Sequence, residues 1–234
     1  AVEGTRLVEE AVKAGTSPVL VFYTGAWAET PAAHHLLPLL AHAEGETWLV
    51  SDPVLAACAS TQTPQGVLVV LPFPALQSRP GLILILDGLR DPGNLGTILR
   101  SAEAAGVGQV ILTPGSVDLY NPKVVRGAMG AHFRLPANTL DWPVISDKVA
   151  GRTVWLADTA GKVSYDAVDW SRPSVLIVGG EAAGATEAAI ALSTGRVSIP
   201  MTTGVDSLNA AMAATVILFE AARQRRSNAG KEPV

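Results

Sequence analysis

Cysteine is almost missing from this chain of 234 residues, since Cys58 is the only one. A single cysteine excludes an internal disulfide and fits a protein of the reducing cytosol. We expect Cys58 to be a small, buried, apolar residue. His34 and His35 fall in a predicted helix, but no cysteine or carboxylate stands at ligand spacing from them, so we predict no metal site.

Long apolar runs are missing too. A membrane span needs about 18–20 apolar residues, whereas runs such as residues 67–71 and 82–86 have the length of a strand. There is no signal peptide, no Gly-x-Gly-x-x-Gly loop and no Walker lysine. We therefore expect a cytoplasmic protein with no membrane partner. The chain starts at Ala1, without an initiator Met and in the middle of the pattern that continues with Val-Glu-Gly-Thr-Arg. We therefore expect the natural N-terminus to lie upstream.

The composition is that of a folded protein. It is 48% hydrophobic and 16% charged, which is enough for a sizeable core. The net charge of −4 argues against a broad electrostatic grip on nucleic acid, although a local basic patch is compatible with it.

Periodicity divides the chain in two. In the first part, helices are expected at residues 5–14, 30–43 and 52–59, and strands at 18–23, 47–50 and 66–71. Alternation of this kind predicts a small α/β domain. Three prolines and a glycine between residues 72 and 81 then break every pattern. We predict a first domain at residues 1–76, a linker at 77–81 and a second domain at 82–234.

The second part predicts a mostly parallel sheet with helices on both faces. Strands are expected at residues 82–87, 109–112, 154–157, 174–178 and 197–199. Helices are expected at residues 93–105, 122–129, 143–150, 186–192 and 207–225. Ligands of such sheets bind at the carboxyl ends of the strands.

Residues 199–210 lead into the closing apolar helix. Gly204 supplies backbone freedom, and Asp206 or Ser207 is the expected N-cap. Ser207 and Asn209 would then form a polar corner on the first turn of this helix. A binding site and an ordinary helix cap explain this corner equally well.

Two earlier stretches also combine polar residues with a strand end. Residues 87–102 read as a strand end, a turn and a helix, with Asn94 near the helix start and Arg100 two turns in. An anion site or a capped turn with a surface arginine fits this pattern. Residues 176–184 read as a strand that ends in Gly179, Gly180 and Glu181. Its glycines allow close approach of a ligand, but a tight strand–helix turn needs them as well.

Together, the three stretches resemble the signature motifs of the SpoU (TrmH-like) RNA methyltransferases, in the SPOUT α/β-knot superfamily. The motif D-x-x-x-D-P-x-N-x-G-x-I-x-R-x-A runs from Asp87 to Ala102, and G-x-E-x-x-G runs from Gly179 to Gly184. The motif I-P-M…G…S-L-N runs from Ile199 to Asn209. The resemblance covers residues 82–225, with one mild departure at Ala182, where many members carry glycine. The first domain more loosely resembles the family's ribosomal-protein-like RNA-binding domain.

This resemblance implies an enzyme that transfers a methyl group from S-adenosylmethionine to a ribose 2′-hydroxyl of RNA. The substrate expected first is 23S ribosomal RNA, and transfer RNA second. The implied fold contains a deep trefoil knot formed by the C-terminal segment, and the implied assembly is a homodimer. An active site can then take its arginine from one subunit and its cofactor from the other.

The resemblance also implies roles for residues. Those expected to contact the cofactor are Gly179, Ile199, Met201, Leu208, Asp158 and Thr159. Arg100 is expected at the reacting hydroxyl, with support from Asn94, Glu181, Ser207 and Asn209. A guanidinium is essentially always protonated, so we expect Arg100 to stabilise the developing alkoxide or clamp a neighbouring phosphate rather than act as a base. The candidate contacts to RNA phosphates are Arg6, Lys123, Arg126 and Arg134, for which a solvated face is the alternative.

Two other classes of function stay open on these residues. One is a non-catalytic RNA- or ribosome-binding protein that keeps the fold. The net charge of −4 mildly favours weak or guided RNA binding, but the intact motifs weigh more. The other is a small-molecule methyltransferase, against which the separate first domain argues, because a small substrate needs no second docking surface.

Overall fold

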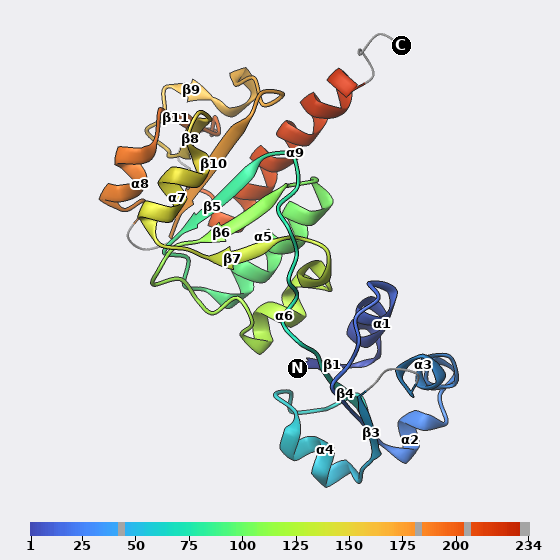
Figure 1. The fold of residues 1–234 in the computed structure, drawn as a ribbon. Coiled ribbons are helices and arrows are strands. Elements are labelled where there is room, and N and C mark those ends of the chain that lie inside the picture. Colours follow the sequence, from blue (N-terminus) through green and yellow to red (C-terminus); the bar gives the residue numbers. More distant parts are fainter. Residues whose placement is uncertain (42–44, 181–183, 204–206, 230–234) are drawn as a thin grey trace. The chain divides into compact units, whose positions relative to one another are not determined.

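The structure is a computed structural model that describes residues 1–41, 45–180, 184–203 and 207–229 (Figure 1). It divides into two compact units. The first comprises Ala1–Ala75 and Met129–Arg134, and the second comprises Leu76–Ala128 and Leu135–Val234. Within the described ranges, no helix is long and apolar enough to cross a membrane.

The first unit is built on a four-stranded sheet with the order β1-β4-β2-β3. Its strands are β1 (Val2–Glu3), β2 (Leu20–Tyr23), β3 (Glu46–Leu49) and β4 (Val67–Val70). β2 runs parallel to β3, and β4 runs antiparallel to both β1 and β2. The helices are α1 (Thr5–Lys13), α2 (Gly25–Ala28), α3 (Pro31–Ala41) and α4 (Asp52–Cys58), followed by the 3-10 helix η1 (Ala131–Phe133).

The expected α/β alternation of the first part is confirmed, with two omissions and one error. The omissions are β1 and α2, which have only two and four residues. The error concerns Cys58, which is exposed rather than buried. It ends a seven-residue helix in which Leu55 is the only residue buried, so the last turn of α4 covers no core.

The second unit is built on a seven-stranded sheet with the order β7-β6-β5-β10-β8-β11-β9, in which neighbouring strands run parallel. Its strands are β5 (Ile83–Asp87), β6 (Gln109–Leu112), β7 (Ala137–Thr139), β8 (Thr153–Ala157), β9 (Val163–Ser164), β10 (Ser174–Gly179) and β11 (Gly195–Ser198). The helices are α5 (Pro92–Ala104), α6 (Pro122–Ala128), α7 (Trp142–Val149), α8 (Glu187–Leu192) and α9 (Ala210–Ala229), with the 3-10 helix η2 (Tyr165–Ala167).

Helices cover both faces of this sheet, as predicted (Figure 1). Ile145 of α7 and Ala189 of α8 pack with buried strand residues such as Ile85 and Ile177. On the other face α5 contacts both α6 and α9, and α9 contacts β10. The short edge strands β7 and β9 are absent from the sequence prediction, because two or three residues carry too little periodicity.

The position of β10 brings the first two motif stretches together. β10 lies between β5 and β8, although each of its residues is 92 positions away from its partner on β5. Gly179 pairs with Asp87, and Val178 pairs with Ala157. The carboxyl ends of β5, β10 and β8 therefore meet at one edge of the sheet. Sequence periodicity gave the strands, but not this order.

Helix α9 begins at Ala210, three residues later than predicted. Its cap is Asn209, whose Oδ1 accepts hydrogen bonds from the N–H groups of Ala211 (2.9 Å) and Met212 (3.3 Å). The prediction that Ser207 caps this helix is therefore wrong, and the alternative cap, Asp206, lies outside the described residues, as does Gly204. Moving the cap to Asn209 leaves Ser207 in the segment before the helix.

Candidate active site

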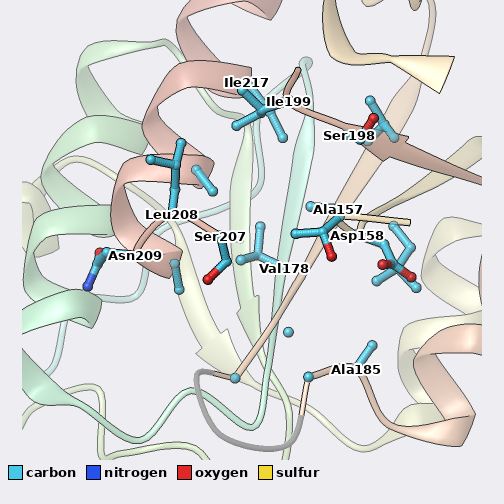
Figure 2. Close-up of a pocket in the computed structure, with 18 of the residues that line it drawn as sticks. Ala157, Asp158, Val178, Ala185, Ser198, Ile199, Ser207, Leu208, Asn209 and Ile217 are labelled. Atoms are coloured by element: carbon cyan, nitrogen blue, oxygen red, sulfur yellow. The ribbon is translucent and has the colours of Figure 1, made fainter. Parts of the chain in front are cut away.

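A pocket of about 540 Å³ opens at the carboxyl ends of β8, β10 and β11, next to the start of α9 (Figure 2). This volume lies within the range of roughly 300–1,000 Å³ that is usual for small-molecule sites. The described lining residues are Leu156, Ala157, Asp158, Thr159, Val178, Gly179, Gly180, Gly184, Ala185, Ile190, Val197, Ser198, Ile199, Met201, Ser207, Leu208, Asn209, Ala210, Ala213 and Ile217.

The lining combines apolar walls with a few polar groups. Figure 2 places Ser207 and Leu208, just before α9, across the cavity from Ala157 and Asp158, at the end of β8. Such a mixture suits a ligand with both an aromatic and a polar part. The six residues expected at the cofactor, from Asp158 to Leu208, all line this one pocket.

Gly179, Gly180, Gly184 and Ala185 form one wall, which we call the glycine turn. Gly180 and Gly184 form an isolated antiparallel bridge, and Gly184 has a positive φ of 66°. A Cβ on Gly180 would lie 2.5 Å from the carbonyl oxygen of Gly88, a contact that no side chain tolerates. The glycine at this position is thus required by the packing of the chain on itself, besides any contact with a ligand.

Asp158, which follows β8, is held in place by two side-chain contacts. Its Oδ2 lies 2.8 Å from Nη1 of Arg196, and its Oδ1 accepts a hydrogen bond from the N–H of Ala160 (2.9 Å). The loop after β8 is therefore tied to β11. Arg196 was missed in the sequence, because it lies 38 residues away from its partner in an ordinary strand pattern.

Asn209 joins the pocket to α5. Since its Oδ1 is used to cap α9, its Nδ2 is the donor to Oδ1 of Asn94, at 3.0 Å. Asn94 in turn stands on the first turn of α5, where its own N–H donates to Asp91 Oδ1, the N-cap of that helix (2.7 Å). Two predicted catalytic residues, 115 positions apart, are thus in direct contact.

Comparison with known proteins decides the family. Residues 81–219 match the SpoU rRNA Methylase family, and residues 1–69 match the MRM3-like substrate binding domain. The chain belongs to the SpoU rRNA methylase family. The resemblance inferred from the three motifs is thereby confirmed.

Relatives match this SpoU chain along almost its whole length. The human protein "rRNA methyltransferase 3, mitochondrial" is 34% identical over 97% of this chain and 68% of its own. The "23S rRNA (guanosine(2553)-2'-O)-methyltransferase RlmP" of Bacillus subtilis is 32% identical over 93% of this chain and 86% of its own. The crystal structure of the SpoU methyltransferase AviRb from Streptomyces viridochromogenes in complex with AdoMet has a TM-score of 0.84 and 32% identity, and the match covers 97% of this chain and 90% of that one.

Arg100, the residue of the first SpoU motif that is expected at the reacting hydroxyl, is not among the residues that line the pocket. It is exposed on α5, whereas its neighbours Ile98, Leu99 and Ala102 face the core. The next residue, Ser101, has its Oγ 2.9 Å from Oγ1 of Thr215 on α9. The structure therefore brings Ser207 and Asn209 to the pocket lining and Asn94 into contact with Asn209, whereas Arg100 is not among the lining residues. Glu181 lies outside the described residues.

The candidate RNA contacts are divided between the two units. Arg6 is exposed on α1 and, with Arg134, belongs to the first unit; Lys123 and Arg126 stand on α6 of the second. Nη1 of Arg134 forms an ion pair with Glu10 at 2.9 Å. Among the described residues, no group of three His, Cys, Asp or Glu side chains is placed to hold a metal ion.

Proposed function

We propose that this chain transfers the methyl group of S-adenosylmethionine to a ribose 2′-hydroxyl of 23S ribosomal RNA. The observation that carries the proposal is that one pocket is lined by all six residues expected at the cofactor. The chain that contains this pocket belongs to the SpoU rRNA methylase family. The names of the Bacillus relative and the cofactor in the AviRb crystal support the same reaction, substrate and cofactor.

The chemistry of the pocket fits this cofactor. Leu156, Val178 and Ile217 offer apolar surface for a base, whereas the polar backbone of the glycine turn and of Asp158–Thr159 offers hydrogen bonds to a ribose and an amino acid. When bound, the cofactor supplies a methyl group that its sulfonium has already activated. The protein must then hold a ribose hydroxyl in line with that methyl and stabilise the oxygen as its proton leaves.

We assign the stabilisation to Arg100, assisted by Asn94. A guanidinium keeps its proton at any physiological pH, so Arg100 donates hydrogen bonds to the developing alkoxide or to an adjacent phosphate. Asn94, whose amide is oriented by Asn209, lies on the first turn of α5, the helix that also carries Arg100. Ser207 supplies a hydroxyl to the pocket lining.

We further propose a homodimer in which Arg100 of one subunit serves the pocket of the other. Arg100 is exposed and outside the lining of its own chain's pocket, which supports delivery in trans. A surface for the partner is offered by α9, on which Met212, Val216 and Phe219 are 55%, 37% and 42% exposed at helical spacing. The deep trefoil knot and a cytoplasmic location belong to the same proposal, supported by family membership and by the lone cysteine.

Calorimetry and a methyl-transfer assay test the function together. We expect S-adenosylmethionine to bind the wild-type chain, and transfer of radioactive methyl to 23S rRNA to exceed transfer to tRNA. Mapping of 2′-O-methyl groups in a deletion strain then identifies the nucleotide. Absence of binding at millimolar cofactor would favour a non-catalytic RNA-binding protein, and methylation of tRNA alone would correct the substrate.

A further inference from the structure

Asp87 is a carboxylate in the interior of the second unit, at the end of β5, and no role in the reaction falls to it. It is only 1% exposed. Its Oδ1 accepts a hydrogen bond from the hydroxyl of Thr113 (3.1 Å), and its Oδ2 accepts one from the N–H of Thr186 (2.6 Å). The Thr113 hydroxyl oxygen also accepts a hydrogen bond from the N–H of Gly88 (2.9 Å).

Asp87 and its neighbour Gly88 contact both ends of the glycine turn. At its beginning, Gly179 pairs with Asp87 in the sheet, and Gly180 packs on the carbonyl of Gly88. At its end, Thr186 follows Ala185 directly and donates its N–H to the Asp87 side chain. The wall of the pocket that the glycine turn forms is therefore tied at both ends to Asp87 and Gly88.

A carboxylate suits this position better than any neutral side chain. Burying a charge is costly unless strong hydrogen bonds compensate, and here two donors approach the two oxygens from different elements. Thr186 is the N-cap of α8, and its hydroxyl already accepts a hydrogen bond from the N–H of Ala189. The carboxylate satisfies the backbone N–H of the cap residue itself, and its negative charge is favourable at a helix start.

We propose that Asp87 is a positioning residue for the cofactor: it latches the glycine turn to β5 and β6 so that this wall keeps the shape that binds S-adenosylmethionine. The inference rests on the proposed function, because it names the ligand of the same pocket. Asp87 lines no part of the pocket and acts through Gly179, Gly184 and Ala185, which do.

The variant Asp87→Asn tests the latch, because it keeps the shape and removes one of the two acceptor oxygens. With a folded variant, we expect the Kd and KM for S-adenosylmethionine to rise about tenfold, whereas kcat at saturating cofactor changes little. Thr186→Ala is the matched control. It removes the hydroxyl cap of α8 but keeps the backbone N–H that donates to Asp87, so it should lower thermal stability without raising Kd.

Thr113 supplies a second test from the other side of the latch, in case Asp87→Asn fails to fold. Thr113→Val removes the hydroxyl and should raise Kd, whereas Thr113→Ser keeps it and should bind as wild type. Unchanged cofactor affinity in folded Asp87→Asn or Thr113→Val would overturn the latch. A wild-type chain that binds no cofactor would instead overturn the proposed function, so the two failures are distinguishable.

Discussion

Asn209 serves two elements with one amide group. Its oxygen caps α9, and its nitrogen donates to Asn94 on α5. Because the cap fixes which end of the amide is oxygen, it also fixes which end of Asn94 faces Asn209. One residue therefore combines a contribution to stability with the orientation of a neighbouring catalytic candidate.

Two substitutions separate these contributions. Asn209→Asp keeps a good N-cap but puts an acceptor opposite the Asn94 oxygen, so Asn94 must turn its amide round. We expect stability within a few tenths of a kcal/mol of wild type and at least a tenfold loss of kcat. Asn209→Ala should lose about 1 kcal/mol of stability as well. Thermal unfolding and methyl-transfer rates measure both; full activity in Asn209→Asp would show that capping is the only role.

Arg100 is tested by a change that keeps the charge. Arg100→Lys loses the planar fork of donors, so we expect kcat to fall at least tenfold while the Kd for S-adenosylmethionine stays unchanged. Calorimetry and a pH–rate profile are the measurements. Near-normal turnover, with a profile shifted to the pKa of a lysine, would instead identify this position as a general base.

At the scale of the element, α9 is fastened near its C-terminal end by a polar network. Both oxygens of Glu220 bind Arg223, at 2.7 and 2.8 Å, and Gln224 Nε2 donates to Glu220 and to the carbonyl of Val168. Gln224 Oε1 accepts the N–H of Trp170, whose side chain is fully buried. The hydrogen bonds from Arg223 lower the pKa of Glu220 from 4.5 to about 2.

This pKa predicts a stability that depends on pH. Because the folded state favours the Glu220 carboxylate, its contribution is complete above about pH 4.5 and is lost as pH falls towards about 2. We expect wild type to lose stability more steeply than Glu220→Gln over that window. The difference should be at most about 1 kcal/mol, since Arg223 is largely exposed. Urea unfolding at several pH values measures it, and parallel curves would contradict the assignment.

At the scale of the whole molecule, the proposed dimer supplies each pocket with an Arg100 that the pocket's own chain does not place in its lining. Asn94 and Arg100 share α5, and Asn94 forms a hydrogen bond with Asn209 of the pocket lining, whereas Arg100 is not among the lining residues. If Arg100 acts in trans, α5 and α9 of each chain contribute to two different active sites. Charge on the exposed face of α9, as in Phe219→Glu, should then yield monomers in sedimentation and remove activity.

Mixing two inactive variants tests delivery in trans. Ala157→Phe fills the pocket, and Arg100→Ala removes the guanidinium. After subunit exchange of equal amounts, half of the dimers are mixed and each has one complete site, so we expect roughly a quarter of wild-type activity. Either variant alone serves as the control. A mixture as inactive as its parts, with exchange verified, would place both groups in the same subunit.

Local chemistry explains why much of this protein was predictable. Apolar runs and their spacing gave the main strands and helices of both units, and the motifs gave a resemblance that implied the family and six of the residues that line the pocket. Edge strands of two or three residues and the exposure of Cys58 escaped, because they depend on which surfaces happen to be covered. The cap of α9 was misassigned because Asp206, Ser207 and Asn209 are all good caps, and the sequence offers no means of choosing among them.

What the sequence by itself determined was therefore the main helices and strands, which follow from apolar spacing, and the three motifs. The resemblance carried by those motifs implied the family and six of the residues that line the pocket. Only the tertiary structure decided that β10 enters between β5 and β8, that Asn209 reaches Asn94 and that Asp87 holds Thr186. The last two contacts span 115 and 99 residues. Contacts at such separations depend on the order of strands in the sheet, and a periodic pattern along the chain carries no information about that order.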